Sequence, residues 1–349
     1  MAAVGTLCPF ELTSGRTGEG MQDGTLHRMM WVFPDRESTR TNAKWSAAFW
    51  RTYEEVAKDV GLTWERVPPE AITVDALDPG SPRVYVEGEP VDPRDTLFVT
   101  SPYTLPYQMA DAFNQLTLYA VLENAGFYLP HPARYATVFN DKLATLLFLA
   151  DCPVPPVPTV RVTPGRDTLF DDFLPAVRWL PYPAFVKPAG WMASRGINLA
   201  RDAHDVRGLL SLAQGGDTTL VLQPYLGART VDYRVYMVDG KPHTTLVRMP
   251  GDGAIYPQVT TGARIRFEEV PEELVAASEY LAAKLPIPYF CADFLHDGER
   301  FWLSEIEPDG MIVCPDPTST EAVRTQREII RDRFLAYAKA HAAFTGGAR

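Results

Sequence analysis

The sequence is short of the features that mark several large classes of protein. Its four cysteines (Cys8, Cys152, Cys291 and Cys314) and six histidines are scattered, and no CxxC pair occurs. Neither a zinc site nor a disulfide framework is expected, and the thiols are interpreted as reduced. No stretch approaches the roughly 18 apolar residues of a membrane span. A basic segment followed by an apolar one is missing at the N-terminus, so we expect no secretory signal and predict a cytoplasmic location.

Common nucleotide-binding and hydrolase signatures are missing too. There is no GxxxxGK[ST] loop, no GxGxxG turn behind a strand, no HRD or DFG motif and no GxSxG elbow. Positive charge is in deficit: 33 Lys and Arg residues stand against 44 Asp and Glu residues, which gives a net charge of −11. This balance argues against nucleic acid or an anionic membrane as the main partner. A local positive pocket for a small anion is still compatible with it.

What is present is the composition of an ordinary globular protein, with 46% apolar and 22% charged residues in a chain of 349. A chain of this length usually forms two or three domains. Residues 1–24 are expected to be a mobile tail. A strand, helix, strand, helix order then predicts a small α/β domain with a parallel sheet over 25–135. The expected elements of that domain are a strand at 27–35, a helix at 45–60, a strand at 95–103 and a helix at 108–126.

Beyond residue 135, short β-like runs alternate with helices, which predicts two α+β subdomains over 136–226 and 227–345. The proline-rich stretch at 152–160 is expected to be extended. The expected strands lie at 184–188, 219–223, 232–239, 243–248, 289–295 and 301–307. The expected helices lie at 140–150, 203–213, 272–285 and 319–341.

Two lysines stand where an anion can be held. Lys142 opens the helix at 140–150, and Lys187 ends an apolar strand before a loop, residues 189–196, that is rich in small residues. Small residues let backbone N–H groups wrap closely round an anion, so this loop suits a polyphosphate. Taken alone, each lysine is more often a solvated surface charge.

The segment TLVLQPYLGA, 219–228, fits the base of a nucleotide. Pro224 has no N–H but keeps its carbonyl, which can accept from an adenine amino group, and the N–H of Leu226 can donate to the ring. A plain strand that ends in a turn is the alternative interpretation.

Two arginines lie on the hairpin predicted by the Asp-Gly turn at 239–240. In the register of a two-residue turn, Arg234 lies opposite Thr245, toward the same end of the hairpin as Arg248. The rigid fork of arginine suits phosphate or carboxylate. Exposed arginines on a hairpin without any ligand remain the alternative.

Two glutamates, Glu305 and Glu307, lie two residues apart in FWLSEIEPDG and so share one face of a strand. Either that face is wet or a cation lies between them. A hairpin that brings Asp293 to the same face would make three carboxylates converge. Hard oxygen ligands without His or Cys favour Mg²⁺ over zinc.

The metal hypothesis depends on the register of that hairpin. A three-residue loop, 297–299, would pair His296 with Arg300 and Asp293 with Leu303, and would leave Asp293 diagonal to Glu305. A two-residue loop would shift the register by one and turn Asp293 to the other face.

Taken in this order and spacing, the segments resemble the ATP-grasp ligases, most of all the glutathione synthetase and ribosomal-protein glutamate-ligase branches. The matching stretches, within residues 115–310, are NDKLAT with VPPVPT behind it, FVKPAGWMASRGI, LVLQPYLGARTVDYRVYMVDGKP, LVRMP and CADFLHDGERFWLSEIE. The resemblance implies an ATP-grasp fold, in which two α+β subdomains clasp ATP, preceded by the small parallel-sheet α/β domain.

The resemblance also implies roles for single residues. Residues matched to nucleotide binding are Lys142, Lys187, Ser194, Gly196, Gln223, Pro224, Tyr225, Leu226 and Asp232. Residues matched to the γ-phosphate and acyl phosphate are Arg234 and Arg248, and those matched to magnesium are Asp293, Glu305 and Glu307. Glu307 departs from the family pattern, because asparagine is usual there. A second departure lies at 254–265, where only Gly262 is comparable, so the acceptor site is not carried over.

The implied reaction activates a carboxylate as an acyl phosphate, and an amine of an amino acid or peptide then displaces phosphate to form an amide. ATP and Mg²⁺ are the implied cofactors, with two ions and Mn²⁺ as a substitute, and a homodimer is one state that the resemblance allows. Lysines, arginines and magnesium would neutralise charge at the phosphoryl group. Two alternatives stay open: phosphorylation or intramolecular cyclisation on the same fold, and a non-catalytic ATP-binding regulator.

Overall fold

The computed structural model describes residues 25–33, 43–100, 112–163, 175–192, 194–251 and 262–347. The tail predicted at 1–24, the start of the helix predicted at 108–126 and most of the segment 254–265 lie outside these ranges. No helix within them is long and apolar enough to cross a membrane.

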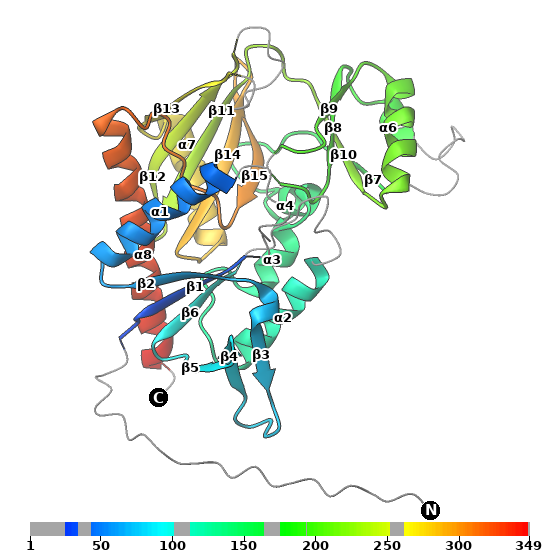
Figure 1. Ribbon diagram of the computed structural model, residues 1–349. Helices are drawn as coiled ribbons and strands as arrows, with labels where there is room; N and C mark the ends of the chain where they lie inside the picture. Colours follow the sequence, from blue (N-terminus) through cyan, green and yellow to red (C-terminus); the bar gives the residue numbers. More distant parts are fainter. Residues whose placement is uncertain are drawn as a thin grey trace, which may run out of the picture.

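A parallel sheet of order β2–β1–β6 organises the N-terminal part, as predicted (Figure 1). Its elements are β1 (Arg28–Val32), α1 (Ala43–Asp59), β2 (Thr63–Val67), β6 (Thr96–Thr100) and α2 (Ala112–Asn124). Met29 and Trp31 join the core cluster of α1, whereas Met30 and Val32 join that of α2. A strand covered on both faces is apolar throughout, which explains the run MMWV.

A second sheet, which was not predicted from the sequence, follows β2. It is antiparallel, and its elements are η2 (Pro69–Ala71), β3 (Ile72–Asp75), β4 (Arg83–Val86) and β5 (Glu89–Val91). Val84 and Val86 of β4 join the apolar cluster of Met30 and α2, so this small sheet helps to cover one face of the parallel sheet.

A four-stranded antiparallel sheet of order β7–β10–β8–β9, covered by α6, forms the next layer. Two short helices, α3 (Ala133–Phe139) and α4 (Lys142–Phe148), precede it. Its elements are β7 (Val160–Val162), α5 (Pro175–Arg178), β8 (Ala184–Pro188), β9 (Asn198–Ala200), α6 (Ala203–Gly215) and β10 (Leu220–Pro224). Between α4 and β7, Val157 donates to the carbonyl of Leu303 at 2.9 Å, so the proline-rich stretch is extended, as predicted.

The largest sheet has five antiparallel strands in the order β13–β12–β11–β14–β15. Its elements are β11 (Val231–Val238), β12 (Lys241–Met249), β13 (Arg264–Glu268), α7 (Glu272–Lys284), β14 (Tyr289–His296), β15 (Phe301–Glu307) and α8 (Thr320–Gly347). We call it the central sheet. Val235 and Phe290 pack with Leu281 of α7 on one face, whereas Tyr236 packs with Phe334 of α8 on the other.

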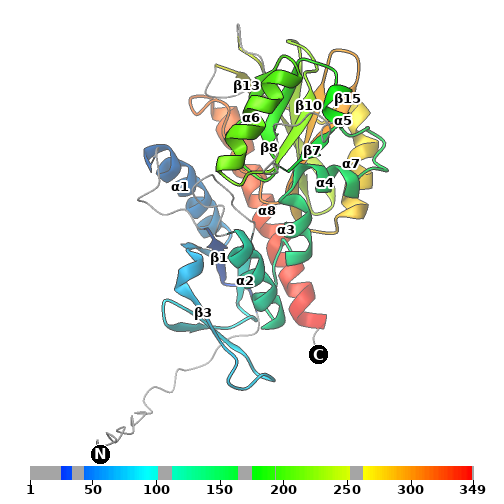
Figure 2. The same cartoon turned by 90° about the vertical axis from the view of Figure 1, so that its right-hand side faces the viewer.

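The final helix, α8, connects the two main sheets. In Figures 1 and 2 it runs from the central sheet down along the N-terminal parallel sheet. Phe334 and Tyr337 of α8 belong to the same buried cluster as Trp31 of β1 and Tyr53 of α1. The N-terminal layer and the central sheet therefore share one core.

Candidate functional site

The predicted carboxylates converge on the β14–β15 hairpin. Asp293 lies directly opposite Glu305, and Cys291 lies opposite Glu307. One oxygen of each of Asp293, Glu305 and Glu307 lies within 4.8 Å of the other two. We call these three side chains the carboxylate cluster, and its predicted convergence is confirmed.

The predicted register of this hairpin is wrong. His296 pairs with Phe301, not Arg300, so the loop has four residues, 297–300. The Asp297 carboxylate closes this loop by accepting from the backbone N–H of Arg300 at 2.9 Å. A β-bulge at Ser304 then shifts the register by one residue, which makes Asp293 and Glu305 direct rather than diagonal partners. The two one-residue differences restore the shared face.

The register predicted for the β11–β12 hairpin is wrong in the same way. Arg234 lies opposite Leu246 rather than Thr245, because the register shifts between Tyr236 and Met237. Arg234 also lies opposite Asp293 on the neighbouring strand. Arg248 is two residues from Leu246, so both arginines point to the face that carries the carboxylate cluster.

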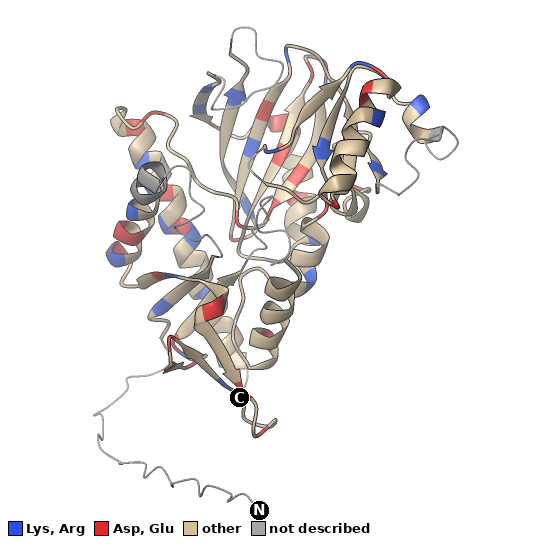
Figure 3. Cartoon of the chain, turned by 45° about the vertical axis from the view of Figure 1, so that its right-hand side comes forward, with Lys and Arg blue, Asp and Glu red and all other residues tan. Residues whose placement is uncertain are grey.

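The two arginines and the acids form one ionic network. Arg234 binds Asp293 through two hydrogen bonds of 2.8 and 2.7 Å, and its Nη2 is also 2.7 Å from Glu307. Arg248 donates from Nη2 to Asp293 at 3.0 Å and lies 2.8 Å from Asp232. Basic and acidic positions are interspersed on this sheet (Figure 3). Asp232, matched to nucleotide binding, thus lies beside Arg248, which was matched to the γ-phosphate and acyl phosphate.

The network sets the ionisation of its members. Burial opposes ionisation of Asp293, but Arg234 and Arg248 together hold its pKa below the usual value. Burial raises the pKa of Glu307 to about 7, although Arg234 opposes the shift. Burial also raises the pKa of Asp232. Asp293 is therefore the firmly charged acid of the network.

Lys142 connects the carboxylate cluster to the loop behind β8. It is the first residue of α4, whose N-cap Asp141 accepts from the N–H groups of Leu143 and Ala144. The backbone N–H of Lys142 donates to the Ala189 carbonyl at 3.1 Å. Its ammonium donates to the Trp191 carbonyl at 2.9 Å and lies 3.4 Å from Glu305.

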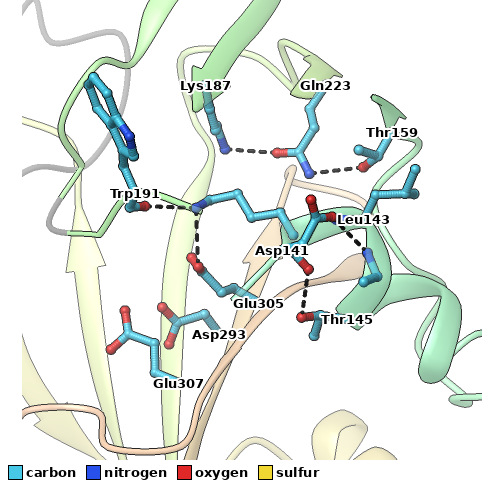
Figure 4. A network of polar contacts seen from close by, with 12 residues as sticks. Asp141, Leu143, Thr145, Thr159, Lys187, Trp191, Gln223, Asp293, Glu305 and Glu307 are labelled. Atoms are coloured by element: carbon cyan, nitrogen blue, oxygen red, sulfur yellow. Dashed lines mark hydrogen bonds and ion pairs between the residues drawn. The ribbon is translucent and has the colours of Figure 1, made fainter. Parts of the chain in front are cut away.

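Lys187 projects from β8 toward the same region (Figure 4). Its ammonium donates to the side-chain carbonyl of Gln223 at 2.8 Å, and Gln223 in turn donates to the hydroxyl of Thr159 at 3.0 Å. Burial and the nearby charge of Lys142 lower the pKa of Lys187 to about 8. A bound anion would raise this pKa again, since it favours the charged form.

In the segment predicted to hold adenine, the N–H groups of Tyr225 and Leu226 differ in their partners. The N–H of Tyr225 donates to the Pro183 carbonyl at 2.9 Å, and Pro224 pairs with Ala184 at the end of β10. Within the described ranges, no hydrogen bond engages the N–H of Leu226. The N–H of Leu226, unlike that of Tyr225, is therefore open to a ligand, whereas the Gln223 side chain is turned toward Lys187.

The loop behind β8 is pressed against its neighbours. Ser194 and Gly196 have positive φ values of 55° and 72°. A Cβ at Gly190 would lie 2.7 Å from the Asn140 carbonyl oxygen, and one at Gly196 would lie 2.7 Å from Pro188. Gly190 and Gly196 therefore have no room for a side chain, and Ser194 and Gly196 adopt the left-handed backbone conformation that glycine favours. A pocket opens beneath the loop, and its lining includes Asn140, Lys142, Gly190, Trp191, Met192, Glu305 and Glu307.

The donor set of the carboxylate cluster fits magnesium. It offers carboxylate oxygens alone, with no imidazole or thiolate among the three members, and hard cations prefer oxygen. Glu305 and Glu307 are partly open, with side chains 30% and 22% exposed, and both line the pocket. Asp293 is more enclosed and is held by both arginines.

Comparisons by sequence find no relative: no protein-family model and no curated protein matches the chain. Comparison of structures finds solved proteins of similar fold. The ATP-grasp ligase PsnB, in complex with a phosphomimetic variant of its minimal precursor, Mg and ADP, superposes with a TM-score of 0.59 at 16% identity. The match covers 88% of this chain and 99% of that one. The chain has the ATP-grasp fold.

Two further structures share the ATP-grasp fold with this chain. D-cycloserine synthetase DcsG has a TM-score of 0.56 and 19% identity, over 90% of this chain and 99% of that one. D-alanyl-alanine synthetase A from Vibrio cholerae O1 has a TM-score of 0.58 and 16% identity, over 92% of this chain and 98% of that one. The predicted fold class is thus confirmed, whereas the subdomain boundaries and the roles of single residues stay predictions.

Sequence reasoning missed several contributors to this site. Asp141 was visible in principle, because Asp directly before a helix is a standard N-cap. Thr159 and the carbonyl of Trp191 carry no such signal, since their contacts join residues 64 and 49 positions apart.

Proposed function

We propose that the protein is an ATP- and Mg²⁺-dependent carboxylate–amine ligase. It would activate a carboxylate as an acyl phosphate and condense it with an amine of an amino acid or peptide, with release of ADP and phosphate. The cytoplasmic location and a homodimer remain predictions from the sequence.

One observation carries this proposal: a carboxylate cluster, two arginines and a lysine converge beside a glycine-containing loop in an ATP-grasp fold. Phosphoryl transfer asks little covalent chemistry of a protein, and it depends on positioning and on neutralising charge. A protein that only binds ATP has no need of so many ionic groups around the terminal phosphate.

The nucleotide would be held from two sides. Lys142 and Lys187 would neutralise the phosphates beneath the loop at 189–196, which supplies backbone N–H groups. The carbonyl of Pro224 and the N–H of Leu226 would bind the adenine edge. Because the described hydrogen-bond partner of the Lys187 ammonium is the neutral side-chain carbonyl of Gln223, an arriving phosphate would gain an ionic contact there.

The reacting end would be formed by the central sheet. Asp293, Glu305 and Glu307 would hold magnesium, which supplies charge neutralisation and alignment of the phosphoryl group. Arg234 and Arg248 would stabilise the acyl phosphate by donating N–H groups to its oxygens. Their contacts with Asp293 keep both guanidinium groups oriented before substrates bind.

Neighbouring structures support the same class of chemistry. PsnB is described as a ligase and was solved with Mg, ADP and a precursor variant. The Vibrio cholerae protein is described as a D-alanyl-alanine synthetase, whose product is built from amino acids. Both kinds of substrate, peptide and amino acid, therefore belong in a test of this protein.

The test is a substrate screen that follows ADP release and the mass of every product. A ligase gives the mass of acid plus amine minus water, cyclisation gives one substrate minus water, and phosphorylation adds a phosphoryl group. We expect Mg²⁺-dependent ADP release together with the condensed mass. Absence of substrate-dependent ADP across a broad panel of amino acids and peptides would count against a ligase.

Variants of the carboxylate cluster test its role. Asp293→Ala and Glu305→Ala should abolish turnover, whereas Glu299→Ala, an exposed acid in the loop of the same hairpin, should not. Because Asp293 neutralises the buried Arg234 and the partly buried Arg248, circular dichroism must show that its variant is folded. Near-normal rates in both cluster variants would remove the metal assignment.

A further inference from the structure

A buried arginine lies behind the carboxylate cluster. Arg333 of α8 is 0% exposed, and its guanidinium carbon lies 3.9 Å from the ring centroid of Tyr289, 4.5 Å from that of Trp31 and 5.3 Å from that of Tyr337. Burial of a guanidinium is costly unless a counter-charge and hydrogen bonds accompany it. Arg333 should therefore have a buried counter-charge and hydrogen-bond partners.

The counter-charge is Asp309, two residues after Glu307. Its carboxylate forms an ion pair with Arg333 through Oδ1 and accepts a hydrogen bond of 2.7 Å from the indole N–H of Trp31 through Oδ2. Arg333 also donates to the hydroxyl of Tyr337 at 2.8 Å. Asp309 is thus held from α8 and from β1 of the N-terminal layer at the same time.

The turn that follows the carboxylate cluster, residues 308–312, is fixed along its length. The N–H of Gly310 donates to the Glu307 carbonyl at 3.2 Å, and its carbonyl accepts from the hydroxyl of Tyr289 at 2.6 Å. The N–H of Ile312 donates to the hydroxyl of Tyr53 at 3.1 Å. These contacts leave the end of β15 little freedom.

Gly310 also brings the turn against the strand that pairs with Glu307. A Cβ at Gly310 would lie 2.3 Å from the sulfur of Cys291, and Cys291 is the cross-strand partner of Glu307. Neither Asp309 nor Arg333 lines the pocket, so neither is placed to touch a nucleotide. An effect of this pair on the site would therefore be indirect, through the turn that joins Asp309 to Glu307.

We propose that Asp309 and Arg333 are positioning residues that set Glu307 at the metal site and couple it to the N-terminal layer. The inference rests on the proposed ATP site. A displacement of about 1 Å in a catalytic or binding group is enough to cost large factors in function. Loss of the ion pair should therefore weaken the metal-dependent part of nucleotide binding more than the metal-independent part.

The experiment measures ADP binding by calorimetry in saturating Mg²⁺ and in EDTA. The ratio of the two dissociation constants reports the metal contribution and does not depend on catalysis. In Asp309→Asn the ratio should fall at least tenfold, with affinity in EDTA little changed. Trp31→Phe keeps an aromatic ring at this position but removes the indole N–H that donates to Asp309, so a smaller fall in the same direction is expected.

Ile330→Val is the control, since it trims a buried side chain of α8 that carries no polar group. It should leave the ratio unchanged. A wild-type ratio in both Asp309→Asn and Trp31→Phe, or equal losses in Mg²⁺ and EDTA, would overturn the positioning role. If Asp309→Asn does not fold, Trp31→Phe decides alone. Absence of any Mg²⁺ effect in the wild type would instead refute the proposed ATP site and the inference with it.

Discussion

His131 makes the junction between the N-terminal layer and the central sheet sensitive to acid. Its ring is 1% exposed, with Nδ1 3.1 Å from the Thr100 carbonyl and Nε2 3.2 Å from the Tyr289 carbonyl. Burial, together with the positive charge of Arg333, lowers its pKa from 6.5 to about 3. The folded protein therefore keeps this ring neutral, whereas the unfolded chain protonates it near pH 6.5.

The sign and size of the effect follow from proton linkage. Between pH 6.5 and 3 the unfolded state binds more protons at this site, so acidification lowers the free energy of unfolding. From pH 7.5 to 5.5 the contribution of this one ring is about 1.4 kcal/mol, with a limiting slope of about 1.4 kcal/mol per pH unit below that.

Urea unfolding of the wild type and of His131→Gln at pH 7.5, 6.5 and 5.5 measures the contribution of His131 to the free energy of unfolding. All other titrating groups are common to the two proteins, so the change with pH in their stability difference isolates the ring. The difference should move by about 1.4 kcal/mol in favour of the variant over this range. A difference that stays constant would mean that the folded protein protonates His131 as readily as the unfolded chain does.

Three further predictions follow from single contacts. Lys142→Met removes the ammonium that lies 3.4 Å from Glu305, so Mn²⁺ titration without nucleotide should show about tenfold tighter binding; equal or weaker binding would contradict it. Gly310→Ala should cost about 1–3 kcal/mol by overpacking against Cys291, measured by urea unfolding, and an unchanged midpoint would refute the close contact. Lys187→Met should lower ADP affinity at least tenfold in calorimetry without lowering the thermal midpoint of the free protein; a large drop in that midpoint would show that the lysine is structural.

Elements whose ends are marked by turn residues could be predicted closely. β8 and β15 coincide with the runs predicted at 184–188 and 301–307, because each is a short apolar run closed by proline, glycine or charge. β7 and β9 have three residues each and were missed. So short a strand carries no periodicity, and its existence is decided by the neighbour with which it pairs.

The alternation of side chains along a strand predicts only part of the carboxylate cluster. Spacing by two places Glu305 and Glu307 on one face without any knowledge of the fold. Their relation to Asp293 depends on the loop length and on the bulge at Ser304, and each shifts the register by one residue. The correct convergence followed from a wrong register, because the two shifts compensate. Nothing local in the sequence announces a bulge of this kind.

Contacts between distant segments could not be predicted at all. The hydrogen bond from Trp31 to Asp309 spans 278 positions, and the pair of Arg333 with Asp309 needs α8 to lie across both sheets. The helical spacing of its apolar residues predicts the existence of α8 and the position of its apolar face. It does not say which of its charged residues will be buried.

The order of synthesis gives the position of α8 a consequence for folding in the cell. Trp31 lies against Arg333, which is made about 300 residues later. At roughly 5–20 residues per second the ribosome needs about 15–60 s to add that length. For that time the first sheet has α1 but not α8 on this face, so part of its apolar surface is open to chaperones or to another nascent chain. Its core closes only when the last helix leaves the exit tunnel.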